Sequence, residues 1–144
     1  MRWRFLAIGK PKLAFAAAGV EEYARRLRGM AKFELEFLRP GADEGRQLLE
    51  KSAGCFRLVL DERGRQFSSP ELARFIEKQE LGGTDRIAIL IGGADGHSHE
   101  LRNQADGLWS LSQGTLPHEL ALVVALEQIY RALTISAGHP YHRI

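Results

Sequence analysis

The chain has 144 residues, the size of one compact domain, and we expect a single domain over residues 1–144 with a core that needs no disulfide or metal. Hydrophobic residues make up 44% and charged residues 26%, which excludes a disordered or collagen-like chain. The net charge of +2 excludes a purely electrostatic nucleic-acid binder, although residues 1–60 carry 12 basic and 7 acidic residues and residues 61–144 carry 8 and 11. A polyanion would therefore meet the first half of the chain preferentially.

The single cysteine, Cys55, can form no intramolecular disulfide, and it excludes a cysteine-based metal cluster. A reducing cytoplasm fits this cysteine usage best. The apolar run near the N-terminus covers only residues 5–8, which is too short for a signal peptide. The longest apolar stretch, residues 120–126, is too short to cross a membrane, so we expect a cytoplasmic protein without a membrane span.

The hydrophobic pattern predicts strands that alternate with helices. In chain order we expect a strand at 3–8, a helix at 15–27, a strand near a sheet edge at 33–38, a short helix at 43–52, a strand at 56–61, a helix that opens at 69–72, a strand at 87–91, a polar helix at 99–105, a short apolar segment at 108–111 and a long helix at 118–137.

This alternation predicts an α/β fold, with a mostly parallel sheet and helices on both faces. In such sheets ligands bind at the carboxyl ends of the strands. The loops after Leu60, Ile91 and Leu111 are therefore where we expect a binding site.

Residues 91–96, Ile-Gly-Gly-Ala-Asp-Gly, place three glycines directly after a predicted buried strand. Without Cβ atoms, their backbone N–H groups can approach a ligand closely. The spacing fits neither the dinucleotide fingerprint nor a P-loop. A tight turn that merely leaves the strand explains the same residues, so both interpretations remain open.

A second loop, residues 111–119, is rich in small residues and contains Pro117. Its backbone could wrap a flat heterocycle while Leu111 and Leu116 cover the two faces. The alternative is a plain helix entry with the proline in the first turn.

The last helix is apolar on more than one side, because Leu122 and Leu126 lie on one face while Leu120 and Val124 extend the apolar surface around it. A helix of this kind must be buried on more than one side. We therefore expect a two-fold dimer, with unusual packing inside one chain as the alternative.

The tail, residues 137–144, concentrates two histidines, a tyrosine and an arginine. Such groups can stack on a base, hold phosphate or move a proton, although a tail that caps the helix end is the alternative. His97, His99 and His118 show no clear third metal ligand nearby, so we expect no metal site.

Taken together, these segments resemble the RlmH family of bacterial ribosomal RNA large-subunit methyltransferases, over the whole chain and most specifically in residues 90–143. The motifs that carry the resemblance are Leu-Ile-Gly-Gly-Ala-Asp-Gly at 90–96, Trp-Ser-Leu-Ser at 109–112, Thr-Leu-Pro-His at 115–118, Glu-Gln-Ile-Tyr-Arg-Ala at 127–132 and His-Pro-Tyr-His-Arg at 139–143. The chain departs from the family at Ala94-Asp95, where Pro-Glu is usual, and at Ile144, where an acidic residue is usual.

The resemblance implies a SPOUT fold, whose C-terminal segment threads a deep trefoil knot, a rare exception to the rule against threaded connections. It implies S-adenosylmethionine as the methyl donor and homodimers in which each pocket lies close to the partner chain. Carried over residue by residue, the contacts with the methyl donor fall at the ends of two predicted strands and on one continuous segment. These residues are Leu60, Gly92, Leu111, Ser112, Gln113, Gly114, Thr115 and Leu116.

The resemblance also implies methylation of N3 of a pseudouridine in 23S rRNA, so we expect the ribosome as partner and neither DNA nor a membrane. Arg131 and Arg143 match positions suited to stabilising charge on the imide or to holding phosphate. His142 is the candidate proton acceptor, and Tyr141 is a candidate for stacking on the base.

Two other functions stay open at this point: a non-catalytic RNA- or ribosome-binding module, and a SPOUT methyltransferase that acts on tRNA. Binding of S-adenosylmethionine separates the first from an enzyme. For the grip on RNA phosphates the sequence suggests five basic residues of the first half of the chain: Lys10, Lys12, Arg25, Arg26 and Arg28.

Overall fold

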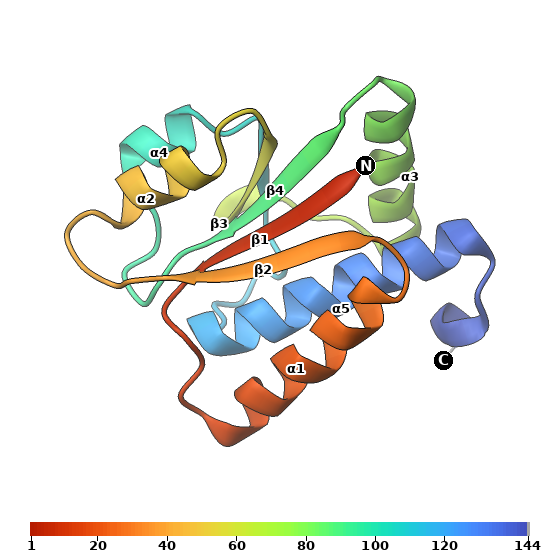
Figure 1. The fold of residues 1–144 in the computed structure, drawn as a ribbon, viewed down its shortest axis with the longest axis horizontal. Coiled ribbons are helices and arrows are strands. Elements are labelled where there is room, and N and C mark those ends of the chain that lie inside the picture. Colours follow the sequence, from red (N-terminus) through yellow and green to blue (C-terminus); the bar gives the residue numbers. More distant parts are fainter. Residues whose placement is uncertain (144) are drawn as a thin grey trace.

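The computed structural model describes residues 1–143 and the side chains of residues 1–141. Every predicted element is present and in the predicted order (Figure 1). The elements are β1 (Arg2–Ile8), α1 (Ala14–Arg28), β2 (Lys32–Leu38), α2 (Glu44–Lys51), β3 (Phe56–Arg65), α3 (Ser69–Leu81), β4 (Arg86–Ile91), α4 (His99–Asn103), β5 (Gly107–Trp109), α5 (His118–Ala137) and the 3₁₀ turn η1 (Pro140–Arg143).

The five strands form one parallel sheet in the order β2-β1-β4-β3-β5. β2 lies at an edge, as its alternating charges predict. β4 lies at the centre, and its five residues from Ile87 to Ile91 are all buried, which explains why its sequence is continuously aliphatic. The prediction of a mostly parallel sheet is confirmed.

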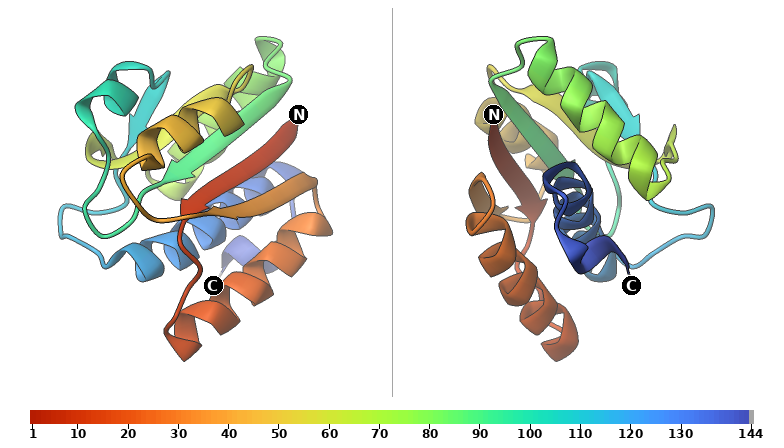
Figure 2. Two further views of the ribbon diagram at one scale, coloured as in Figure 1. Left: turned by 60° about the vertical axis from the view of Figure 1, so that its left-hand side comes forward. Right: turned by 90° about the vertical axis from the view of Figure 1, so that its right-hand side faces the viewer.

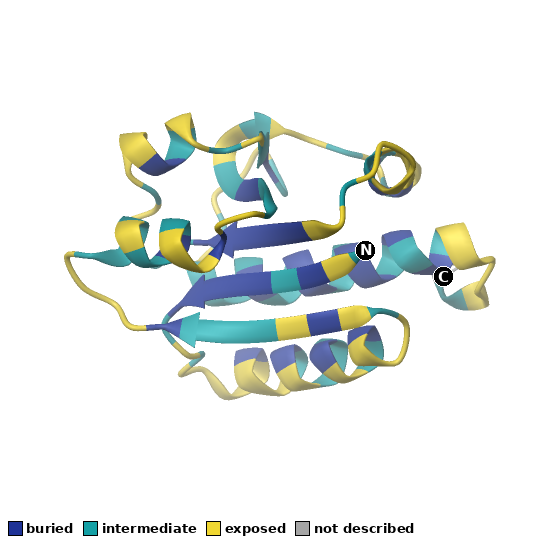
Figure 3. Cartoon of the chain, turned by 45° about the horizontal axis from the view of Figure 1, so that its top comes forward, coloured by how far each residue is buried: buried dark blue, intermediate teal, exposed yellow. Residues whose placement is uncertain are grey.

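Helices cover both faces of the sheet, as expected (Figures 1 and 2). On one face Phe5 and Ile89 pack with residues of α1, α3 and α5. On the other face their neighbours Leu6 and Leu90 pack with residues of α2 and α4, including Leu48. Successive strand residues point to opposite faces, so each buried strand contributes to two cores. Figure 3 shows that the central strands are buried over most of their length.

Helix ends follow local chemistry. Ser68 and Glu71 form a reciprocal capping box at the start of α3, which has a proline in its first turn. Gly138, with φ of 70°, ends α5 in the left-handed conformation and turns the chain back toward the helix. This turn sets the course of η1.

β3 differs from the prediction because it runs four residues further, to Arg65. Leu60 and Arg65 both pair with Trp109 of β5, so the residues between them bulge out of the sheet. The bulge lies at the carboxyl end of the strand, where a ligand site is expected.

Candidate functional site

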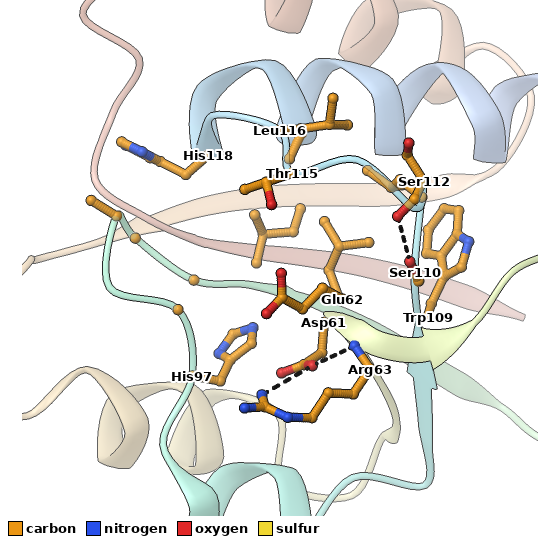
Figure 4. Close-up of a pocket in the computed structure, with 18 of the residues that line it drawn as sticks. Asp61, Glu62, Arg63, His97, Trp109, Ser110, Ser112, Thr115, Leu116 and His118 are labelled. Carbon is orange, nitrogen blue, oxygen red and sulfur yellow. Dashed lines mark hydrogen bonds and ion pairs between the residues drawn. The ribbon is translucent and has the colours of Figure 1, made fainter.

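A cavity of about 520 Å³ lies at the carboxyl ends of β3, β4 and β5 (Figure 4). This volume is within the range of sites for small organic ligands. Seven of the eight residues proposed from the family resemblance as donor contacts line it: Leu60, Gly92, Leu111, Ser112, Gly114, Thr115 and Leu116. The eighth, Gln113, is exposed and does not line the cavity.

The bulge of β3, residues 61–64, forms one wall of the pocket. Gly64 makes this wall possible, because a Cβ atom there would overlap the backbone of Leu108 and Trp109. The bulge thereby brings three charged side chains to the cavity, those of Asp61, Glu62 and Arg63.

Asp61 anchors the bulge from within. Its side chain is only 5% exposed, and its Oδ1 accepts a hydrogen bond of 2.9 Å from the backbone N–H of Arg63. The guanidinium groups of Arg63 and Arg102 lie 3.5 and 3.8 Å from its carboxylate oxygens. A nearly buried carboxylate needs such partners, and these contacts make Asp61 an anchor of the bulge.

The glycine loop after β4 forms the opposite wall. A Cβ atom on Gly92 would lie 3.1 Å from Cε1 of His97 and 3.2 Å from the backbone of Gly96, so a side chain there would displace the loop. Arg102 Nη1 donates a 2.6 Å hydrogen bond to the backbone oxygen of His97, which ties the loop to α4.

His97 lies between these walls. Burial lowers the pKa of His97 below its ordinary 6.5, and the nearby Asp61 only partly offsets this effect. Its Nε2 is buried and has no hydrogen-bond partner within the described part of the chain. A buried imidazole with one unpartnered nitrogen therefore lies beside the cavity.

The third wall is the segment between β5 and α5. Ser110 Oγ donates to the backbone oxygen of Ser112 at 3.0 Å, and Ser112 Oγ accepts from the backbone N–H of Gly114 at 3.0 Å. These bonds hold the loop in a curve, with Leu111 and Leu116 beside backbone polar groups. Such a mixture suits a flat heterocycle with hydrogen-bonding edges.

The tail residues predicted to be catalytic lie elsewhere. Tyr141 and Arg131 do not line the cavity; they belong to a group of side chains on α1, α5 and η1, here called the tail cluster, which consists of Tyr23, Arg26, Glu127, Tyr130, Arg131 and Tyr141.

Hydrogen bonds and stacking hold the tail cluster together. Tyr141 donates to Glu127 at 2.8 Å and lies 3.1 Å from the hydroxyl of Tyr23. Arg131 pairs with Glu127 at 2.7 Å, and the guanidinium of Arg26 lies within 6 Å of all three tyrosine rings. Burial raises the pKa of Tyr141 far above its ordinary value, with help from its hydrogen bonds, so the hydroxyl remains a neutral donor.

The structure separates this cluster from the cavity of the same chain. The cavity contacts α5 at His118 and Ala121, in its first turn. Arg131 lies about 15 Å further along the helix axis than Ala121 and does not line the cavity. The side chains of His142 and Arg143, and all of Ile144, lie outside the described residues.

Of the five candidate phosphate contacts, Arg25 and Arg26 pair with Glu22 at 2.7 and 2.6 Å. Arg26 also belongs to the tail cluster, which leaves it poorly placed for a free phosphate. Lys10 and Lys12 are exposed.

Sequence analysis missed several pocket residues, of which Asp61, Glu62 and His97 are the most relevant to chemistry. The turn-like Asp-Glu-Arg-Gly run after the third predicted strand was the available signal, because ligands gather at strand ends. Among the described residues, no group of three His, Cys, Asp or Glu side chains could hold a metal ion.

One described helix, α5, is long and apolar enough to cross a membrane by length and composition. It carries Glu127 and Arg131, and Leu122, Leu126 and Ile129 of this helix are buried in the domain core. Packing inside the domain therefore accounts for the apolar character of this face of the helix.

Comparison with known proteins agrees with these features. A family model described as "Predicted SPOUT methyltransferase" matches residues 1–142. Proteins named ribosomal RNA large subunit methyltransferase H are 52% identical in Thermus thermophilus, over 99% of both chains, and 49% identical in Deinococcus deserti, over 99% of this chain and all of the relative.

Solved structures share the fold at lower identity. A "Probable Methyltransferase" from Bordetella pertussis superposes with a TM-score of 0.61 and 20% identity, over 92% of this chain and 94% of that one. A tRNA (m1G37) methyltransferase from Aquifex aeolicus gives a TM-score of 0.55 and 16% identity, over 91% and 70%.

Proposed function

The chain belongs to the SPOUT methyltransferase family, and from this premise we propose that it transfers a methyl group from S-adenosylmethionine to N3 of a pseudouridine in 23S rRNA on assembled ribosomes. The observation that carries the proposal is the full-length likeness, at 52% identity, to a relative named ribosomal RNA large subunit methyltransferase H. A ribosomal substrate means that the enzyme works in the cytoplasm. The chain acts as one domain, with its C-terminal segment threaded as the trefoil knot of the family.

The cavity residues fit the methyl donor. Leu60, Leu111 and Leu116 offer apolar contacts to an adenine ring, and the curved backbone at 112–115 offers hydrogen-bonding groups to its edge. Gly92 leaves room where a Cβ atom would press on His97. Bound there, S-adenosylmethionine supplies a methyl group that its positively charged sulfur activates for transfer.

The enzyme works as a homodimer in this proposal. Large apolar side chains are exposed near the start of α5: Leu13 is 49% and Phe15 58% exposed. The backbone N–H groups of Lys12 and Leu13 donate to Glu119, so this surface is continuous with α5, on which Leu120 and Val124 are also only half-buried. A second copy would cover this apolar surface.

A dimer also explains how the tail residues could reach a cavity. Arg131 on α5 and Tyr141 on η1 do not line the cavity of their own chain, so in this proposal the tail of one protomer serves the cavity of its partner. The tail cluster fixes Tyr141, and through it the start of the segment that carries His142 and Arg143.

In this arrangement the tail residues of one protomer contact the pseudouridine base at the cavity of its partner. Arg131 and Arg143 would stabilise negative charge on the imide carbonyls as the N3 proton leaves, and His142 would accept that proton. Tyr141, held as a neutral phenol, would orient the base by stacking. Much of the rate would come from holding base and donor in line.

Two alternatives differ in what they bind. A non-catalytic ribosome-binding module need not bind S-adenosylmethionine, whereas the built cavity favours an enzyme. A methyltransferase acting on tRNA shares fold and donor, and the likeness to the Aquifex aeolicus enzyme reflects the fold alone.

The test is transfer of a labelled methyl group from S-adenosylmethionine to assembled ribosomes, naked 23S rRNA and bulk tRNA in parallel. We expect label on ribosomes alone, at N3 of one pseudouridine. Label on tRNA would overturn the substrate, and no transfer to any of the three would overturn the activity.

A further inference from the structure

The charges that one chain places around the cavity do not balance. Three carboxylates and two arginines line it, so it carries one net negative charge when its histidines are neutral. Asp61 engages both arginines. Glu62 and Asp95 are exposed, and neither forms an ion pair with any described residue.

Glu62 is the better placed of the two. Leu60 and Arg65 are fixed by pairing with Trp109, and the two neighbours of Glu62, Asp61 and Arg63, are joined by the hydrogen bond from the Arg63 N–H to Asp61. The backbone of Glu62 is therefore held at the crest of the bulge. Figure 4 shows its carboxylate projecting into the pocket.

The ligand of such a pocket is favoured if it is cationic. S-adenosylmethionine carries one net positive charge, because its sulfonium adds to a balanced ammonium and carboxylate. Transfer of the methyl group leaves S-adenosylhomocysteine, whose thioether sulfur is uncharged. An unpaired carboxylate in the cavity attracts the donor and not the neutral product.

We propose that Glu62 is a specificity-determining residue that makes the pocket prefer S-adenosylmethionine to S-adenosylhomocysteine. The inference rests on the proposed function, since it assumes this methyl donor. It gives the enzyme a way to release its product: the attraction from Glu62 ends when the sulfur loses its charge.

Calorimetric titration of the full chain with each ligand tests the inference. Glu62→Gln removes the charge and keeps the size, so we expect binding of S-adenosylmethionine to weaken by about threefold to tenfold, the modest effect of a solvated charge. Binding of S-adenosylhomocysteine should change by less than about twofold. Glu62→Asp should retain most of the preference, and Glu80→Gln, an exposed site on α3 outside the cavity lining, is the matched control.

Salt gives a second readout: added NaCl should weaken donor binding in the wild-type chain more than in Glu62→Gln. Equal changes for both ligands, or no change for either, would overturn the role of Glu62 while leaving the proposed function intact. A wild-type chain that binds neither ligand would contradict the proposed function itself, and the inference with it.

Discussion

The cavity and the tail cluster are built in different ways. The cavity is formed by three loops at one edge of the sheet, and much of its wall is glycine and backbone. The tail cluster joins long side chains of α1, α5 and η1 through hydrogen bonds and cation–π contacts. The first presents backbone and small residues around a cavity, and the second is a network of side chains that fixes η1 against α1 and α5.

The cavity and the tail cluster also lie apart along α5. Each region is formed within one chain, yet about 15 Å of α5 lies between Ala121 at the cavity and Arg131 in the tail cluster. In the dimer that we propose, the tail cluster of one protomer would serve the cavity of its partner. Such a dimer would also cover the half-buried apolar residues on the open side of α5.

The largest expected effect comes from breaking the cavity at its bulge. Gly64→Ala places a Cβ atom into the backbone of Leu108 and Trp109, so β3 and β5 must separate. We expect a loss of about 2–4 kcal/mol in the free energy of unfolding, measured with denaturant, together with loss of donor binding.

Gly29→Ala is the control, because a Cβ atom there would make only ordinary contacts at 3.4 Å or more and φ is −76°. If Gly64→Ala unfolds at the same denaturant concentration as the wild type, the bulge does not approach β5 as described.

The second effect breaks the tail cluster and spares the cavity. Tyr141→Phe removes the hydrogen bonds to Glu127 and Tyr23 but keeps the ring beside Tyr130. We expect methyl transfer to ribosomes to fall about tenfold, which is the loss of roughly 1.4 kcal/mol of positioning. Donor affinity, measured by calorimetry, should stay within about twofold because Tyr141 does not line the cavity.

Tyr23→Phe removes one of the same bonds from the other partner and should show a smaller loss of the same kind. A fall in donor affinity that matches the fall in turnover would mean that cavity and tail cluster are coupled within one chain.

A third, smaller effect concerns contacts with RNA phosphates by basic residues that lie outside both the cavity and the tail cluster. Lys10→Glu combined with Lys12→Glu reverses two exposed charges. Ribosome binding should weaken, and the slope of log affinity against log salt should become less steep by about 1.5, roughly 0.7–0.9 for each lost phosphate contact. An unchanged slope would show that these lysines do not meet phosphate.

The smallest effect is a pH dependence that belongs to the cavity alone. Because burial depresses the pKa of His97 below 6.5, the unfolded chain binds this proton more readily than the folded one. The contribution of His97 to stability is therefore fully present above the pKa of the unfolded state. It is lost as the pH falls from about 6.5 toward the lower pKa of the folded state.

His97→Gln should flatten the decline in unfolding free energy over that window, measured by denaturant titrations at several pH values. His99→Gln, at an exposed histidine, controls for loss of an imidazole. Identical pH profiles for wild type and His97→Gln would contradict the burial of this side chain.

The sequence predicts the framework well and the chemistry of the walls less well. Continuous aliphatic residues at 87–91 and alternating charges at 33–38 reflect burial on two faces and on one, so strand positions follow from local pattern. The strand-end loops follow from the parallel order. Both signals are local in the chain.

What the sequence could not predict depends on contacts between distant segments. The bulge at 61–64 exists because Leu60 and Arg65 share Trp109 as a partner. The hydrophobic periodicity of one strand cannot predict such a shared partner on another strand. The tail cluster joins Tyr23 to Tyr141 across 118 positions. Its separation from the cavity follows from the length of α5, which was predicted, whereas the proposed use of the tail in a partner chain depends on assembly.

The most direct test of the crossed arrangement mixes two inactive enzymes. One chain carries Gly92→Val, which blocks the cavity, and the other carries Arg131→Ala with Tyr141→Ala, which removes tail side chains. Refolded together, heterodimers contain one cavity with intact loops that faces an intact tail, so methyl transfer to ribosomes should return to about a quarter of the wild-type rate if half of the chains pair across types and each such dimer has one working site. A mixture as inactive as its two parents would contradict the claim that the tail of one protomer serves the cavity of the other.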